Sequence, residues 1–288
     1  MNRAGKKDMI MPEQFPQSKI NPLKPGRVVF GITFRQAMRS KKTIFMLIAV
    51  FLPVLLAIVY RILGRDVAPN QPFSRIVRMN PEQTLSLIMP FFLQFLSVLV
   101  ALFYGTALIA DEVDNKTIIY LFTRPVRKYL IILGKFAAYL SEVFVILLPP
   151  VLLTYVIIAT DKGASSSFAD SLGLFGKQFG VTVLSLVVYG AIFTFFGLWW
   201  KRPVLFGLLF GFGWEKMIIV VPGVVRKFSV MHYLMSILPQ SPEARRFMQS
   251  IKATSTDPAL SVVILLIIAI VFLGLSIFTF YRKEYRFE

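Results

Sequence analysis

Long stretches without a charged residue dominate this chain and limit what it can fold into. The longest covers residues 84–110 and contains no Asp, Glu, Lys or Arg over 27 positions. Hydrophobic residues make up 56% of the 288-residue chain, compared with roughly 45–50% in soluble domains. Helices that are apolar on all sides must be buried on all sides, and a single soluble core of this size cannot enclose so many of them. The sequence therefore predicts an all-α integral membrane protein.

The hydrophobic segments predict about six membrane crossings. About 20 mostly apolar residues are needed to cross ~30 Å of hydrocarbon as a helix. The predicted spans are 43–63, 84–110, 129–160, 178–200, 204–225 and 259–281. The fifth is the weakest, because Glu215 and Lys216 interrupt it and three glycines occupy positions 207, 211 and 213. These glycines favour either close packing at a subunit interface or irregular backbone along a cavity.

Basic residues predict that both termini are cytoplasmic. With the N-terminus inside, the inner segments carry 20 of the 32 Lys and Arg residues and the outer connections carry 11, as the positive-inside rule requires. Residues 1–26 are polar and contain four prolines, so we expect a cytoplasmic tail followed by a transmembrane domain over 27–288. The expected location is the cytoplasmic (inner) membrane, with multiple crossings.

The residues before the first span have a helical pattern. Phe30, Phe34 and Ala37 share one side of a helix over residues 27–42, and basic residues share another. This pattern suits an amphipathic helix in the headgroup layer, although an ordinary basic flank would look similar.

Charge and composition exclude several kinds of function. The net charge of +17 fits basic loops that face an anionic leaflet, so we expect membrane lipids and not nucleic acid as partners. The chain has no cysteine and one histidine, His232, which excludes thiolate sites and a histidine metal cluster. We expect no metal site, and we expect His232 to be an ordinary surface or interfacial residue.

The connection between the second and third spans carries the most information. Asp111, Glu112 and Asp114 precede a short apolar run, and basic residues with Pro125 follow it. Acidic residues before a helix and basic residues after it complement the helix dipole, and the proline ends the helix. The pattern predicts a short cytoplasmic helix, parallel to the membrane, whose surface suits docking to another protein.

This connection resembles the permease subunits of type-2 ABC exporters. The family pattern has a glycine, an acidic pair, a threonine before an apolar run, Arg-Pro-Val-Arg, and Gly-Lys at the start of the third span. The matching residues here are Glu112, Thr117, Pro125, Arg127, Gly134 and Lys135. The likeness extends over most of the chain, including the basic segment before the first span.

The resemblance implies a subunit that pairs with a second permease subunit, the same chain or a related one, and with two ABC ATPase subunits. The coupling interface to the ATPase would be formed by Glu112, Asp114, Thr117, Tyr120, Arg124 and Arg127. It would convert closure of the ATPase into movement of the helices, and the subunit would export a substrate.

No nucleotide-binding loop is present in the sequence. A P-loop requires Gly-Lys followed by Ser or Thr, whereas the Gly-Lys pairs here precede Lys7, Phe136 and Gln178. We therefore expect no cofactor in this chain and no enzyme activity of its own, with ATP and Mg bound by the partner ATPase.

Two carboxylates inside predicted spans are candidates for a translocation path, Glu142 and Glu215. A charge in lipid costs about 2.5–3.5 kcal/mol on insertion scales, so each of them either serves transport or pairs with a neighbouring helix. The alternative function is a secondary transporter or channel that uses Glu142. Such transporters commonly contain internal repeats, and residues 43–160 show no clear duplication in 178–281.

Overall fold

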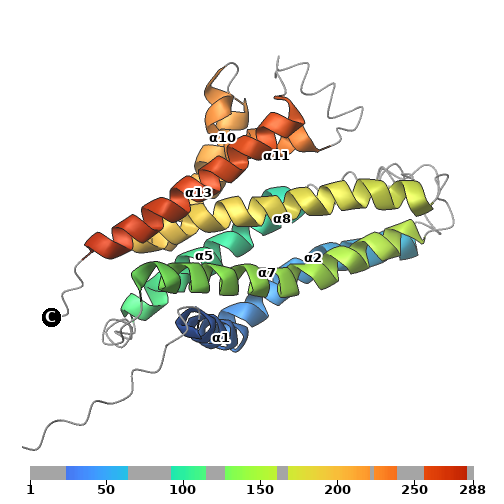
Figure 1. The fold of residues 1–288 in the computed structure, drawn as a ribbon. Helices are drawn as coiled ribbons and strands as arrows, with labels where there is room; N and C mark the ends of the chain where they lie inside the picture. The colour runs from blue at the N-terminus through green and yellow to red at the C-terminus, as the bar shows by residue number, and fades with distance from the viewer. Residues whose placement is uncertain are drawn as a thin grey trace, which may run out of the picture.

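The computed structural model describes residues 24–63, 92–114, 127–160, 168–220, 224–238 and 256–283. Within these ranges the chain consists of helices joined by short turns, without strands (Figure 1). The prediction of an all-α membrane protein is thereby confirmed, and four of the described helices are long and apolar enough to cross a membrane.

These four helices are α2 (Lys41–Leu63), α7 (Lys128–Ala159), α8 (Phe168–Trp199) and α13 (Pro258–Arg282). They contain the predicted first, third, fourth and sixth spans. Helix α8 begins well before residue 178, where the prediction placed its start, because hydropathy marks the lipid-facing part of a helix and not its end. With 32 residues each, α7 and α8 are about 48 Å long and extend beyond the hydrocarbon layer.

The second and fifth predicted spans are less regular. The second is described from Phe92 onward, as the π-helical turn η1 (Phe92–Leu96) and helix α5 (Ser97–Asp114); residues 84–91 lie outside the described ranges. The fifth is one continuous helix made of α9 (Pro203–Leu208), the π-helical turn η2 (Leu209–Trp214) and α10 (Glu215–Val220). Two short helices, η3 (Val224–Phe228) and α11 (Val230–Ile237), then precede α13.

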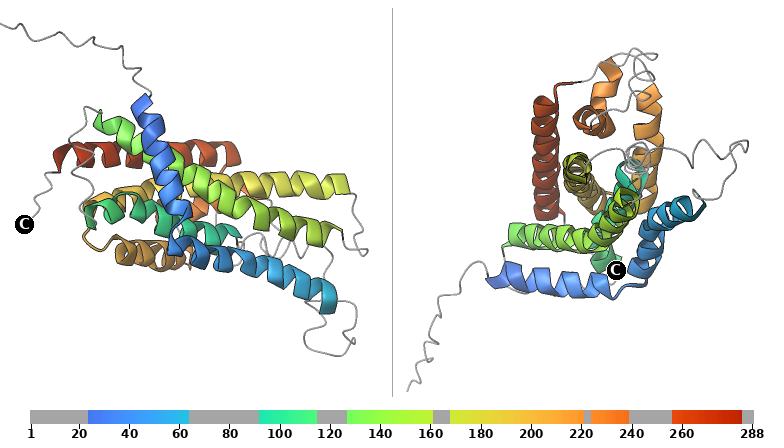
Figure 2. Two further views of the ribbon diagram at one scale, coloured as in Figure 1. Left: turned by 90° about the horizontal axis from the view of Figure 1, so that it is seen from below. Right: turned by 90° about the vertical axis from the view of Figure 1, so that its right-hand side faces the viewer.

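Helix α1 (Lys24–Met38) runs across the long helices and does not lie parallel to them (Figure 2). The prediction of one helix up to Lys42 was wrong, because Ser40 begins a new helix. Its hydroxyl oxygen accepts a hydrogen bond from the Lys42 amide at 3.3 Å, and its carbonyl oxygen accepts one from the Thr43 amide at 3.0 Å. Ser at this position satisfies the free amides of a helix start and so separates α1 from α2.

Helix α8 forms the centre of the bundle and packs against α5, α7, α11 and α13. In the most apolar 18-residue stretch of α8, 78% of the residues are buried, compared with 22% in the corresponding stretch of α13. The rings of Tyr189 and Phe193 are fully buried and stack at 6.0 Å between centroids. Helix α13 instead exposes most of its apolar side chains, as a helix that faces lipid does.

Glycines allow α5 to approach the central helix closely. A side chain at Gly197 of α8 would place its Cβ 2.6 Å from the carbonyl oxygen of Thr106, and one at Gly105 of α5 would lie 3.1 Å from Cβ of Phe193. The α5–α8 pair forms the most extensive helix contact in the described part of the chain. Small residues of this kind permit backbone contact between membrane helices.

Two glycines of the fifth span also pack within the chain. A Cβ at Gly207 would meet Leu102, and one at Gly211 would meet Val98, both on α5. Gly207 precedes the π-helical turn, and Gly211 and Gly213 lie within it. The turn lines an open apolar groove of about 420 Å³, to which Gly213 contributes. The second interpretation of these glycines, irregular backbone along a cavity, therefore agrees with the structure.

Side-chain contacts at the two ends of the bundle show which helix ends lie on the same side. At one end the Nζ of Lys128 lies 5.6 Å from the centroid of the Tyr281 ring, and Lys283 donates to the carbonyl oxygen of Leu198 at 2.5 Å. This end, where α5 and α8 finish and α7 starts, is called the basic end below. At the other end, the distal end, Arg61 donates to the Thr160 hydroxyl at 3.1 Å.

We predict that Gly197→Ala lowers the thermal unfolding midpoint of the purified chain by several degrees. The added methyl group collides with the Thr106 backbone, and overpacking costs about 1–3 kcal/mol, more than the ~1 kcal/mol that alanine gains over glycine in a helix. Gly274→Ala is the matched control, because nothing lies within 4 Å of a Cβ there. Equal midpoints for the two variants would contradict the close α5–α8 contact.

Candidate functional site at the basic end

The predicted coupling interface lies between the end of α5 and the start of α7. The backbone of Glu112 and Asp114 belongs to the last turn of α5. Thr117, Tyr120 and Arg124 lie outside the described residues. Arg127 directly precedes α7 and is exposed, and its Nη1 donates to the Tyr129 hydroxyl at 3.4 Å. The two ends of this connection, the last turn of α5 and the start of α7, therefore both lie at the basic end.

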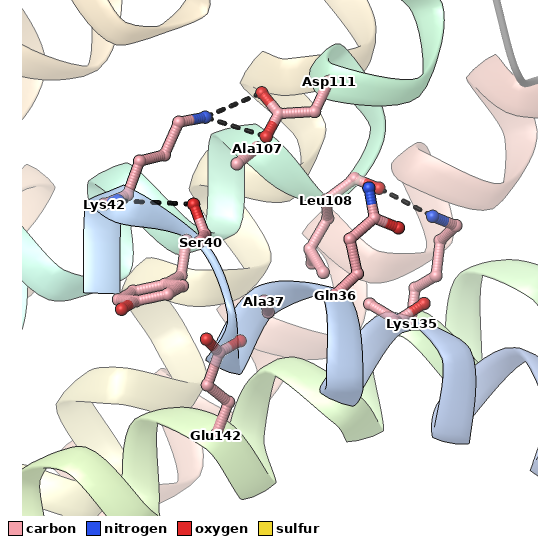
Figure 3. Close-up of a pocket in the computed structure, with 11 residues that line it drawn as sticks. Gln36, Ala37, Ser40, Lys42, Ala107, Leu108, Asp111, Lys135 and Glu142 are labelled. Carbon is pink, nitrogen blue, oxygen red and sulfur yellow. Dashed lines mark hydrogen bonds and ion pairs between the residues drawn. The ribbon is translucent and has the colours of Figure 1, made fainter. Parts of the chain in front are cut away.

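An ion pair joins the end of α5 to the start of α2. The Nζ of Lys42 donates to both carboxylate oxygens of Asp111 at 2.8 Å (Figure 3). The side chains remain 48% and 41% exposed, so the pair contributes only about 0–1 kcal/mol to stability. Its structural effect is to hold the first turn of the first span against the helix that leads into the coupling connection.

The Gly-Lys pair at the start of the third span has a packing explanation. A Cβ at Gly134 would lie 3.0 Å from the carbonyl oxygen of Gly26, so the glycine lets α1 cross directly over α7. Lys135 is 2% exposed and donates to the carbonyl oxygen of Leu108 on α5 at 2.8 Å. The two residues therefore bring α1, α5 and α7 together just behind the coupling connection.

A polar cavity of about 110 Å³ lies among α1, α2, α5 and α7. Glu142 lines it, is 2% exposed, and has no hydrogen-bond partner for its Oε1 among the described residues. In Figure 3 its carboxylate points away from its own helix, toward the break between α1 and α2. Lys42, Asp111 and Lys135 line the same cavity.

Glu215 lies away from this cavity and contacts the N-terminus of α11. Its carboxylate accepts hydrogen bonds from the backbone amides of Val230 and Met231, both at 3.1 Å, and from the Ser229 hydroxyl. Ser229 also accepts from the amide of His232. A carboxylate at a helix N-terminus is stabilised by the free amides and by the helix dipole, so Glu215 fastens the fifth span to α11. The structure does not bring Glu142 and Glu215 together in one site.

His232 is buried, which corrects the prediction that it is a surface or interfacial residue. It is 6% exposed, and its Nε2 lies 3.0 Å from the Thr256 hydroxyl. Burial, and then the positive charges of Arg226 and Lys227, lower the pKa of His232. The imidazole is therefore neutral at pH 7 and joins α11 to the residue that leads into α13.

The sequence did not reveal the ion pair or the cavity at the basic end. Lys42 and Asp111 are 69 positions apart, and no local pattern relates them. The order of the spans could have suggested the ion pair. Lys42 directly precedes the first predicted span and Asp111 directly follows the second, so both lie on the same side of the membrane, where opposite charges of adjacent helices can meet.

Comparison with known proteins identifies a family. Residues 27–285 match the family model described as ABC-2 family transporter protein. A search of curated proteins found no match. The matched region contains every described helix from α2 to α13 and nearly all of α1.

We predict that Glu215→Gln loosens α11 from the bundle. Glutamine has one acceptor oxygen, so its NH₂ group would face one of the two amides, Val230 or Met231, that now bond to different carboxylate oxygens. Each hydrogen bond to a charged group contributes about 1.5–3 kcal/mol. The chain contains no cysteine, so a single Ser236→Cys, at a position only 8% exposed, can report on this docking. Its labelling by a maleimide should accelerate at least about tenfold in the Glu215→Gln background.

The control for this experiment is Asp257→Asn, which removes an exposed carboxylate whose side chain makes no cap hydrogen bond to α13. It should leave the labelling rate unchanged. Unchanged labelling in both backgrounds would show that Glu215 does not hold α11.

Proposed function

The chain belongs to the ABC-2 transporter family, and we propose on this basis that it is the membrane subunit of an exporter driven by a separate ATPase. Family membership makes it a multi-pass permease component of an ABC transporter. The finer proposal adds the direction of transport, outward across the cytoplasmic membrane, and coupling through the connection between α5 and α7. Two permease subunits and two ATPase subunits would form the working assembly.

The observation that carries the proposal is the way the borders of this connection are fastened. Asp111, at the end of α5, is paired with Lys42 of α2. Lys135, two turns into α7, bonds to the backbone of α5, and Gly134 contacts α1. A displacement of the connection would therefore move α1, α2, α5 and α7 together, which is what coupling to an ATPase requires.

The distribution of charge supports a cytoplasmic position for the basic end. Exposed basic residues at this end of the described chain include Arg35, Arg39, Arg127, Lys201 and Arg202. Cytoplasmic segments of membrane proteins are enriched in Lys and Arg. The turn between α8 and α9, which contains Lys201 and Arg202, would offer a second and smaller contact to the ATPase.

We predict that an ATPase co-purifies with the tagged chain from its native membrane and that Arg127→Ala or Glu112→Ala weakens this association at least about tenfold, because removing a charged contact at an interface costs 2–5 kcal/mol. The measurements are the yield of the ATPase after gentle purification and the rate of ATP hydrolysis by the complex. Lys177→Ala is the matched control, since Lys177 is an exposed basic residue of α8 near the distal end.

Transport by the chain alone would overturn this proposal. If vesicles that contain only this chain accumulate substrate under a proton gradient and do not respond to ATP, the protein is a secondary transporter. Loss of the ATPase in the Lys177→Ala variant as well would show that the two basic-end variants act through general instability.

A further inference from the structure

The polar cavity behind α1 has the features of a ligand-binding site. Residues of α1, α2, α5 and α7 line it, and its polar lining includes Gln36, Ser40, Tyr104 and Glu142. Its volume of about 110 Å³ exceeds the roughly 30 Å³ that one water molecule occupies in the liquid. It can therefore hold a small polar group, but not a large organic molecule.

Glu142 is the unusual residue of this cavity. It is 98% buried, and its Oε1 accepts no hydrogen bond from any described residue. Buried polar atoms in proteins are almost always bonded, and leaving a buried charge without a partner is costly. Glu215, the other carboxylate within a predicted span, accepts three hydrogen bonds, so this chain does satisfy a buried carboxylate where the role is structural. The open oxygen of Glu142 marks a place for a donor from outside.

The neighbouring cations are directed elsewhere. The Nζ of Lys42 is bonded to Asp111, and that of Lys135 points to the carbonyl oxygen of Leu108 (Figure 3). Tyr104 donates its hydroxyl hydrogen to Thr43 at 3.0 Å, which leaves lone pairs on its oxygen as acceptors. The oxygens of Gln36 and Ser40 add further acceptors to the lining. Of the charged groups that line the cavity, Lys42 and Asp111 pair with each other and Lys135 donates to a backbone carbonyl. The carboxylate of Glu142 and several neutral oxygens are left to face the cavity.

We propose that this cavity binds a primary ammonium group, with Glu142 as its counter-ion. An –NH₃⁺ group carries three donors in a compact volume, which match the carboxylate and the neutral oxygens around it. An anion would be repelled by the carboxylate of Glu142. A divalent metal ion would require six to eight oxygen ligands, and both carboxylate oxygens of Asp111, the second carboxylate in the lining, are already bonded to Lys42. A quaternary ammonium group has no N–H donor for the open oxygen.

The ammonium group can come from two sources, a free amine or the ethanolamine headgroup of a phospholipid. Helix α1 lies across the bundle, as an interfacial helix does, and so places the cavity near the headgroup layer. On the lipid side of α2, the side chains of Ile44, Phe45 and Ile48 are 63–70% exposed and would accommodate acyl chains. The site is independent of the proposed export function, because it concerns binding by the permease chain alone.

The test compares primary and quaternary amines on the full-length chain. In detergent, ethanolamine should raise the thermal unfolding midpoint, whereas tetramethylammonium at equal ionic strength should not. By native mass spectrometry, the chain should retain phosphatidylethanolamine in preference to phosphatidylcholine. Glu142→Gln should weaken binding of the effective probe at least tenfold, and Asp257→Asn, at the opposite end of the bundle, should leave it unchanged.

The outcomes separate the sources and can overturn the proposal. A shift with ethanolamine identifies a free-amine site, and retention of phosphatidylethanolamine without that shift identifies a lipid site. Three outcomes would each refute the ammonium site. They are equal effects of primary and quaternary amines, undiminished binding of the effective probe to the Glu142→Gln variant, and no binding of either ethanolamine or phosphatidylethanolamine. The comparison of amines uses the wild-type chain, so it decides the matter even if Glu142→Gln does not fold.

Discussion

The backbone contact between α5 and α8 determines the positions of the other helices. It exists because Gly197 lets the backbone of Thr106 on α5 approach α8, and Gly105 leaves room on α5 for the Cβ of Phe193 and the α8 backbone. In lipid, helices gain little from burying apolar surface, since lipid tails are equally apolar, and close van der Waals packing provides the attraction. With α5 held against α8, the fifth span packs onto α5 through Gly207 and Gly211. The core of the subunit is therefore organised by small residues more than by large ones.

Hydropathy predicted the spans because it measures the property that lipid selects. It placed α2, α7 and α13 to within two residues at the ends that the structure describes. It differed at the start of α8 and at the end of the fifth span, which was predicted at residue 225 whereas α10 ends at Val220. The end of α1, predicted from the amphipathic pattern, also differed, because that boundary depends on local hydrogen bonds and not on the membrane. Ser40 ends one helix and begins another within two residues. An amphipathic pattern alone could not reveal this break, because the pattern does not register the hydrogen bonds that Ser40 accepts.

The two carboxylates within spans show why the candidate site could be predicted only in part. Glu142 and Glu215 give the same signal in the sequence, a costly acid in an apolar segment. In the structure, Glu215 meets the N-terminus of a helix that begins 15 positions later, while Glu142 faces a cavity formed by four helices. The difference arises from tertiary contacts between distant segments, which a single sequence does not encode in any local pattern.

The basic end combines these features into a mechanical unit. A surface ion pair such as Lys42–Asp111 contributes little to stability, and its partial exposure means that it can break and re-form at low cost. The bond from Lys135 to the α5 backbone is different, because Lys135 is 2% exposed and breaking the bond would leave a buried ammonium group without this acceptor. Of these two polar links at the borders of the coupling connection, the ion pair breaks at low cost and the buried bond does not. A movement of the connection would carry α5 and α7 as one unit through the Lys135 bond and would move α2 with them while the Lys42–Asp111 pair holds. The cavity that contains Glu142 lies among these helices.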